Sequence, residues 1–243
     1  MLQTSCRSEE MTLTPVPSQT TQMVMVITGS DTATTGHLFC FERGNSELPW
    51  KPVNNPVAVI VGGNGLAWGS GLHSMTEEMK PLKREGDMKS PAGVFTLDAV
   101  FGFAPQPADS TFSMPYIPID EMTECIDDVK SAYYNRVLER DSIHPPDWQS
   151  SEKMIRAVPD YHLGVVVGHN SNPVVPGRGS CIFLHIWSDP GGVTYGCTAM
   201  ASGDMESLAG WLDQARYPIL EQLTAENYQH LKDSWHLPEI ENK

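Results

Sequence analysis

A histidine and a cysteine lie twelve positions apart in the C-terminal part of the chain, at His185 and Cys197. An apolar run, CIFLHIW, leads into the histidine, and a loop with three glycines leads to the cysteine. A strand can hold a base, and a glycine-permitted turn can present a nucleophile beside it. An imidazole that removes or pairs with the proton of a thiol activates it. The alternative is a buried structural cysteine near an unrelated histidine, because cysteines are often buried.

Five blocks of sequence can be compared with known families. In chain order they are KREGDMKSPAGVFTL (83–97), CIDDVKSAYYNRV (125–137), GVVVGHN (164–170), GRGSCIFLHIW (177–187) and TYGCTAM (194–200). With these blocks, the chain from about Gln22 to its C-terminus resembles the L,D-transpeptidase catalytic domain family (the YkuD type), whose members act on peptidoglycan stem peptides. The resemblance implies that Cys197 is the nucleophile and His185 its base.

The chain departs from the commoner signature of that family at two positions beside the cysteine. The commoner form has a second histidine two residues before the cysteine and Asn or Arg two residues after it, where this chain has Tyr195 and Ala199. The gap between histidine and cysteine is also shorter. A smaller branch of the family reads Gly-Cys-x-Ala-Met, as this chain does, and some of its members hydrolyse peptidoglycan cross-links.

The resemblance implies an L,D-transpeptidase that works through a cysteinyl thioester without a metal or organic cofactor. The backbone N–H groups of Tyr195, Gly196 and Cys197 are the expected oxyanion donors, because a tight glycine turn can aim several donors at one point. An L,D-carboxypeptidase or cross-link hydrolase is the first alternative, and a non-catalytic peptidoglycan-binding module is the second. An unrelated cysteine peptidase would need an orienting group on the imidazole, for which Asp189 and Asn170 are candidates.

A group of basic residues offers a candidate site for the carboxylates of a stem peptide. Lys83 and Arg84 belong to the clearest cationic cluster in an acidic chain, together with Lys80 and Lys89. We also expect Tyr195 and Asn170 to contribute to substrate binding. A solvated basic loop is the alternative interpretation of the cluster.

Composition excludes some partners. The net charge of −14 and the pI of about 4.8 argue against nucleic acid or an anionic membrane as the main partner. No stretch of the sequence approaches the ~20 apolar residues of a membrane-spanning helix. The first nineteen residues lack the apolar core of a signal peptide. Because peptidoglycan lies outside the cytoplasm, we expect an exported protein of the periplasm or cell envelope whose leader is absent from this sequence.

The five cysteines, an odd count, leave at least one thiol unpaired in an oxidising compartment. We expect this thiol to be Cys197, partly exposed and alkylated fastest, with the pairing of the others (Cys6, Cys40, Cys125 and Cys181) undetermined. No CxxC or zinc-finger spacing is present, so no metal is expected. A metal site using Cys181, His185 and either His162 or His169 is the alternative to a core position for Cys181.

Short β-branched and aromatic runs between turn residues predict a mainly β domain with a few helices, built as a β-sandwich or from curved sheets. The best core strands are HLGVVVGH (162–169) and SCIFLHIW (180–187), followed by the glycine-rich turn that carries the cysteine. Residues 1–19 are expected to be a disordered tail and 20–243 the catalytic domain. Helical segments are expected over 127–140, 204–214 (capped by Ser202 or Asp204) and 224–235.

Overall fold

The computed structural model describes residues 14–53, 55–103 and 112–240, and in these ranges the chain is mainly β with two α-helices. This confirms the predicted class. The strands are β1 (Gln22–Thr28), β2 (Thr35–Glu42), β3 (Lys51–Pro52), β4 (Val57–Ile60), β5 (Leu66–Trp68), β6 (Ser90–Gly102), β7 (Tyr116–Pro118), β8 (Thr123–Cys125), β9 (Val137–Glu139), β10 (Glu152–Lys153), β11 (Leu163–Val167), β12 (Phe183–Ile186), β13 (Thr198–Met200) and β14 (Ile219–Thr224). The helices are α1 (Ser202–Trp211) and α2 (Ala225–Leu231).

Eight of these strands close into a mixed barrel in the order β1-β14-β6-β11-β12-β13-β4-β2. The barrel closes because β1 pairs in parallel with β14 on one side and antiparallel with β2 on the other. Of the two predicted arrangements, the sandwich is not formed, and the curved sheet closes into a barrel, which leaves no open edge on these strands. The β1–β14 pairing joins segments that are far apart in the sequence. The local pattern of apolar residues predicts strands but does not indicate which distant strands pair.

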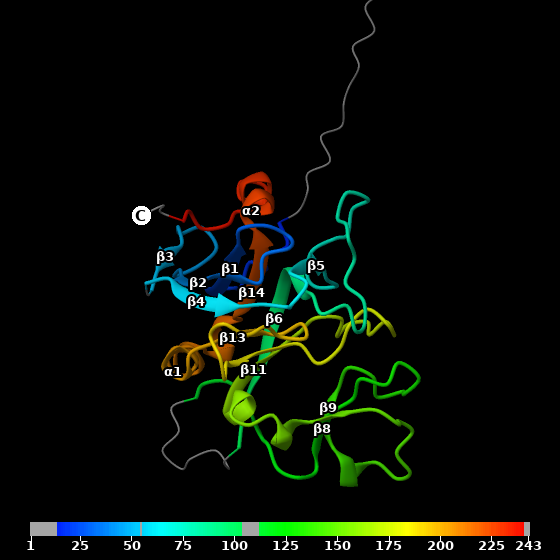
Figure 1. Ribbon diagram of the computed structural model, residues 1–243. Coiled ribbons are helices and arrows are strands. Elements are labelled where there is room, and N and C mark those ends of the chain that lie inside the picture. Colours follow the sequence, from blue (N-terminus) through cyan, green and yellow to red (C-terminus); the bar gives the residue numbers. More distant parts are fainter. Residues whose placement is uncertain (1–13, 54, 104–111, 241–243) are drawn as a thin grey trace, which may run out of the picture.

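Both faces of the central strands are covered. All six residues of β14 are buried, and so are six of the seven residues of β1. Their outer faces pack against other parts of the chain, including α2, which contacts both strands. Figure 1 shows α2 at one end of the molecule and the β8–β9 hairpin at the other. Burial on both sides is consistent with the continuous apolar run MVMVI in β1, whereas β14 also buries the polar side chains of Glu221 and Gln222.

The two α-helices differ in how they begin. Helix α1 starts near the predicted position, but its N-cap is Ala201, which has no side-chain cap, so the expected cap at Ser202 or Asp204 is wrong. The apolar side chains of Met205, Leu208 and Ala209 are buried, which attaches α1 to the rest of the fold. Helix α2 is capped by Thr224, whose hydroxyl accepts from a backbone N–H in the first turn, and it ends before the predicted residue 235.

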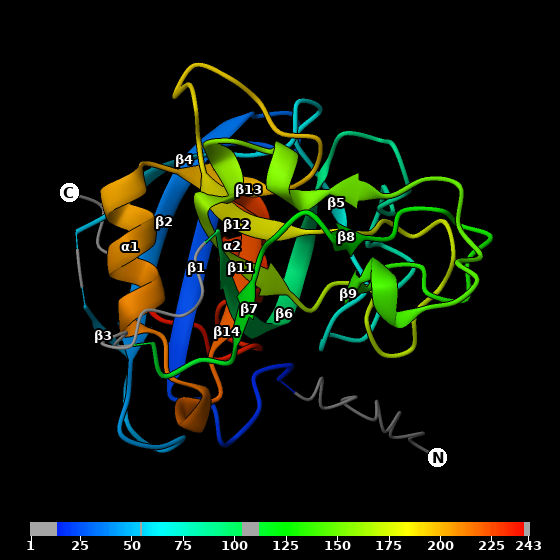
Figure 2. The ribbon, with the colours of Figure 1, turned by 90° about the horizontal axis from the view of Figure 1, so that it is seen from below.

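The insertion between β7 and β11 carries a small sheet in the order β10-β8-β9. The helix predicted over 127–140 is wrong: residues 127–135 form turns, and Asn135 has a left-handed φ of 63°. Local side-chain bonds stabilise the turns, because Asp128 accepts from the Lys130 N–H and Asp147 accepts from the Ala132 N–H. Figure 2 shows this sheet and α1 on opposite sides of the barrel.

Glu124 anchors the small sheet from its interior. Its carboxylate is fully buried and accepts hydrogen bonds from Trp148 and Ser151. It also forms ion pairs with Arg140 and Lys153. A buried carboxylate is tolerated only when it is paired in this way.

Part of the predicted N-terminal tail, residues 1–13, lies outside the described residues. Of the remainder, Val16 is buried and the Thr14 hydroxyl donates to the carbonyl of Trp235. None of the helices in the described ranges has both the length and the apolar content that crossing a membrane requires.

Candidate active site

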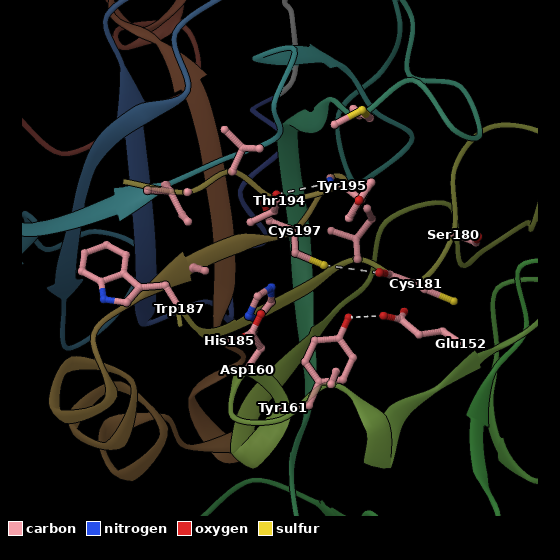
Figure 3. A pocket seen from close by; sticks show the side chains of 18 of the residues that line it. Glu152, Asp160, Tyr161, Ser180, Cys181, His185, Trp187, Thr194, Tyr195 and Cys197 are labelled. Atoms are coloured by element: carbon pink, nitrogen blue, oxygen red, sulfur yellow. Dashed lines mark hydrogen bonds between the residues drawn. The ribbon is translucent and has the colours of Figure 1, made fainter. Parts of the chain in front are cut away.

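The pairing of β12 with β13 brings the predicted base and nucleophile to one face of the barrel wall. His185 is the register partner of Ala199, and Leu184 is the partner of Thr198. Side chains alternate along a strand, so His185 and Ala199 share a face, and Cys197 comes two residues before Ala199 on the same side. All three line a cavity of about 590 Å³. Figure 3 shows His185 and Cys197 in this cavity, together with Tyr161 and Glu152 from the insertion.

The turn before Cys197 requires a glycine at position 196. Gly196 has a φ of +146°, and a Cβ there would lie 3.2 Å from the carbonyl oxygen of Lys89. Two hydroxyls hold the next carbonyl, because Thr194 Oγ1 and Ser90 Oγ both donate to Cys197 O. These contacts fix the backbone beside the sulfur. Sequence reasoning missed both hydroxyls.

One of the three expected oxyanion donors, the Gly196 N–H, has another partner in the resting structure. The Gly196 N–H donates to Thr194 Oγ1 at 3.2 Å, so it is already engaged within the turn. Tyr195, which precedes it, is 85% exposed and lines the outer part of the cavity.

His185 is buried and oriented by the backbone. Its Nδ1 lies 2.7 Å from the Ile186 carbonyl oxygen. Because a carbonyl only accepts, Nδ1 carries the proton in the neutral ring and Nε2 keeps its lone pair. Burial lowers the pKa of His185, while the Ile186 hydrogen bond and the charge of Asp160 act in the opposite direction. The imidazole is therefore neutral at pH 7 and able to accept a proton.

Cys197 is 8% exposed, so the expectation of a partly exposed thiol is wrong. Its sulfur accepts from the Phe183 N–H at 3.3 Å and lies 3.5 Å from the Cys181 carbonyl oxygen. Burial raises the pKa of Cys197 to about 12, and the negative charge of Glu152 adds to the rise. The resting pair is therefore a thiol and a neutral imidazole. No hydrogen bond between the two side chains is seen in the described part of the chain.

Because the Cys197 thiol is buried and protonated, we expect iodoacetamide to alkylate it slowly at pH 7. The rate should rise with pH up to the limit of the folded state, since the thiolate is the reacting species. Peptide mass spectrometry after timed labelling measures this rate, and the urea-unfolded chain is the reference. Labelling in the native protein as fast as in the unfolded chain would contradict the buried, protonated thiol.

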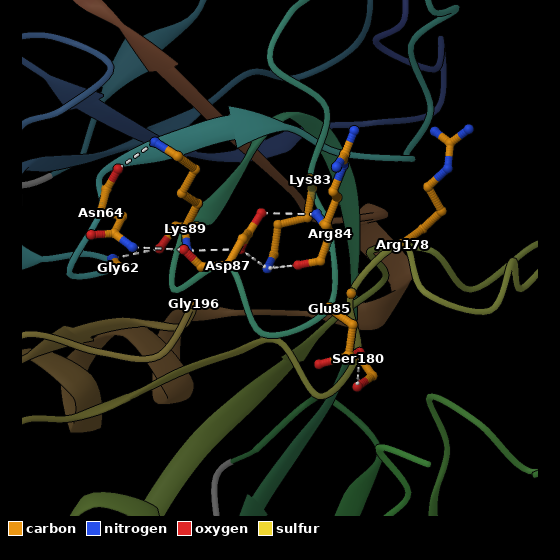
Figure 4. Close-up of polar contacts among 12 residues, drawn as sticks. Gly62, Asn64, Lys83, Arg84, Glu85, Asp87, Lys89, Arg178, Ser180 and Gly196 are labelled. Atoms are coloured by element: carbon orange, nitrogen blue, oxygen red, sulfur yellow. Dashed lines mark hydrogen bonds and ion pairs between the residues drawn. The ribbon is translucent and has the colours of Figure 1, made fainter. Parts of the chain in front are cut away.

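The predicted basic cluster is largely engaged in internal contacts. Lys83 is 3% exposed, and its Nζ pairs with Asp87 Oδ1 and also donates to the Arg84 carbonyl. Lys89 donates to the carbonyl of Asn64. Figure 4 shows the Arg84 side chain extending away from the Lys83–Asp87 pair. Lys83 lines the cavity, whereas Arg84 is not among its lining residues.

Asn170 and Asp189 occupy different positions from those expected. Asn170 is 1% exposed, and its side-chain amide holds the following loop through the backbone of Val175 and the Gly179 carbonyl. It does not line the cavity. Asp189 does line it, but its carboxylate accepts from the Gly191 N–H. The Ile186 carbonyl therefore orients the imidazole, and no side-chain motif in the sequence indicates such a backbone contact.

A disulfide lies next to the sulfur of the predicted nucleophile. It joins Cys125 at the end of β8 to Cys181. Both cysteines are buried in one core cluster, so the predicted core position of Cys181 is confirmed, and the disulfide gives its partner. Cys181 has a left-handed φ of 55° and lies before β12, although the sequence predicted a core strand over 180–187. Cys6 lies outside the described residues. Within the ranges that the structure describes, no group of three His, Cys, Asp or Glu side chains could hold a metal ion.

A comparison with protein-family models matches residues 30–220 to the YkuD model, described as the L,D-transpeptidase catalytic domain. The match covers most of the chain, including the cavity and both predicted reacting residues, so the chain belongs to this family. The family implies a peptidoglycan-modifying enzyme. No curated protein and no solved structure matches the chain significantly.

Proposed function

We propose that the protein is a cysteine acyltransferase that cuts and rejoins peptidoglycan stem peptides, with Cys197 as nucleophile and His185 as general base. The observation that carries the proposal is the position of the two side chains in one cavity, with His185 on β12 and Cys197 directly before β13, the parallel neighbour of β12. The family match supports the substrate class. The disulfide Cys125–Cys181 fits an oxidising compartment outside the cytoplasm, where peptidoglycan lies.

The first half of the reaction forms a thioester. Nε2 of His185 accepts the thiol proton as the Cys197 sulfur attacks the carbonyl carbon of the stem peptide. The carbonyl oxygen becomes an oxyanion, which the backbone N–H groups of Tyr195 and Cys197 stabilise. When the tetrahedral intermediate collapses, the C–N bond breaks and His185 returns its proton to the leaving amine. The buried, neutral state of both groups favours this concerted transfer over a preformed thiolate–imidazolium pair.

The second half of the reaction transfers the acyl group. An amine of a neighbouring stem peptide attacks the thioester, His185 takes its proton, and the thiol is restored. Water in place of the amine gives hydrolysis, which is the alternative activity. Ala199 stands where the commoner signature has Asn or Arg, and it lines the cavity. An apolar residue at that position provides no hydrogen bond to hold an incoming amine, which favours hydrolysis as the second candidate.

A tetrapeptide muropeptide assay with and without excess D-amino acid distinguishes the two activities. We expect mass spectrometry to show D-amino-acid exchange products with the wild-type protein and no product with Cys197→Ala. If only the shortened peptide appears at every amine concentration, the protein is a hydrolase. If Cys197→Ala retains the wild-type rate, the nucleophile is wrong. If the wild-type protein leaves the peptide unchanged, a non-catalytic binding module is the remaining interpretation.

A further inference from the structure

Tyr161 lies beside the two proposed reacting side chains in the cavity. It precedes β11 in a short 3-10 helix, Asp160–His162, and it is 5% exposed. Its ring packs edge-to-face against the His185 imidazole, with 5.2 Å between the ring centroids. Tyr161 and Cys197 also belong to one buried cluster and line the same cavity as His185. One side chain from the insertion therefore packs on the proposed base and lies in the cavity with the proposed nucleophile (Figure 3).

In the resting structure, Glu152 accepts a hydrogen bond from the Tyr161 hydroxyl. The hydroxyl donates to Glu152 Oε1 at 2.7 Å. Glu152 begins β10 and is the register partner of Cys125, the residue whose disulfide reaches Cys181. The small sheet thus places a carboxylate behind the tyrosine. The hydroxyl has a single proton, so while this proton points at Glu152, only the oxygen of Tyr161 faces the sulfur.

A sulfur that gains negative charge needs hydrogen-bond donors. The Phe183 N–H supplies one at 3.3 Å, whereas the Cys181 carbonyl on the other side can only accept. The Tyr161 hydroxyl becomes a second donor if its proton turns from Glu152 to the sulfur. We propose that Tyr161 is a third member of the catalytic set, donating to the Cys197 sulfur whenever it is a thiolate, and that Glu152 is a positioning residue that competes for this proton. The catalytic part of this proposal rests on the proposed function.

The charged groups around the sulfur support opposite roles for the two residues. A hydrogen bond donated by the Tyr161 hydroxyl would lower the pKa of Cys197, whereas the negative charge of Glu152 raises it. Lys83, from the loop before β6, also lowers it. His185 on β12 is neutral, and Asp160 acts on that imidazole. Removing the hydroxyl should therefore make the thiol harder to ionise, and neutralising Glu152 should make it easier.

The test is the pH dependence of Cys197 alkylation by iodoacetamide in Tyr161→Phe and Glu152→Gln. Phenylalanine keeps the ring that packs on Phe101 and Phe183 and removes only the hydroxyl. We expect Tyr161→Phe to raise the apparent thiol pKa and Glu152→Gln to lower it, each by about one unit. At a fixed pH below that pKa, alkylation should then slow about tenfold in the first variant and quicken about tenfold in the second.

Tyr134→Phe is the matched control, since Tyr134 is also buried and its hydroxyl also donates to a glutamate, Glu85. It should leave the Cys197 profile unchanged. A general loosening of the site would move Tyr161→Phe and Glu152→Gln in the same direction, and that result would overturn the proposal. So would the absence of a shift in either variant, or an equal shift in Tyr134→Phe. Alkylation uses no peptidoglycan, so it tests this inference separately from the proposed function. If the two variants shift the thiol pKa in opposite directions but the protein does not turn over muropeptides, the proposed function is wrong and the Tyr161–Glu152 inference is still supported.

Discussion

Replacing His185 by alanine is expected to lower muropeptide turnover by a factor of about 100 to 10,000, the usual contribution of a positioned general base. The thiol it serves is protonated at every pH at which the enzyme would work, because burial raises the pKa of Cys197 to about 12. Without Nε2, no side chain on the same strand face can take that proton. The rate of product formation, measured by mass spectrometry of muropeptides, tests this expectation.

Two further variants separate catalysis from folding. His185 is 5% exposed, so alanine leaves a space beside Tyr161, whereas His185→Asn fills more of it. We expect both variants to lose turnover while circular dichroism shows a native fold. His37→Ala, at an exposed position on β2, is the control and should keep the wild-type rate. A His185→Ala protein that keeps more than about a tenth of the rate would remove His185 from the mechanism.

The same base sets the pH dependence of the reaction. His185 must be neutral to accept a proton, and burial lowers its pKa below the ordinary value of 6.5. Activity should therefore be lost only as the pH falls through this lowered pKa, and it should be nearly constant from pH 7 to pH 9, since the thiol does not ionise there. The profile of kcat/KM against pH reports these groups in the free enzyme. An acidic limb at or above pH 6.5 would show that burial does not control this imidazole.

The proposed reacting pair could be identified from the sequence because its signals are local. An apolar run ends at His185, a glycine turn ends at Cys197, and both lie in one short stretch that the family also marks. The partners of the pair could not be predicted in this way. The Ile186 carbonyl that orients the imidazole has no side-chain signal, and Tyr161 and Glu152 reach the site through the fold of a distant insertion.

The fold shows the same division between local and distant signals. Runs of β-branched residues predicted the core strands, but the closure of the barrel depends on the parallel pairing of β1 with β14 at the far ends of the chain. The helix predicted over 127–140 fails for a related reason. Its local propensity is overridden by the pairing of Cys125 with Val137 in the β8–β9 hairpin and by side-chain bonds from Asp128 and Asp147 that stabilise turns.

Removing the disulfide with Cys125→Ala and Cys181→Ala together should lower the free energy of unfolding by about 4 kcal/mol. The bridge closes a loop with a sequence separation of 56 residues, and in the chain-entropy model a loop of that length gives this order of stabilisation. The double variant is needed because a single substitution leaves a reactive thiol close to Cys197. Urea unfolding followed by tryptophan fluorescence measures the change, and the reduced wild-type protein should give a similar value.

The loss should also reach the site, because the bridge connects two elements that act on the same sulfur. Cys181 presents its carbonyl to the Cys197 sulfur, and Cys125 is the register partner of Glu152, which holds Tyr161. With the bridge removed, only hydrogen bonds and packing keep Glu152 behind the tyrosine, so Cys197 alkylation at pH 7 should become faster in the folded double variant. The free energy of unfolding could instead fall by less than about 1 kcal/mol, with an unchanged alkylation rate. That result would mean that packing around Glu124 holds the insertion in place, and that the disulfide contributes little to the geometry of the site.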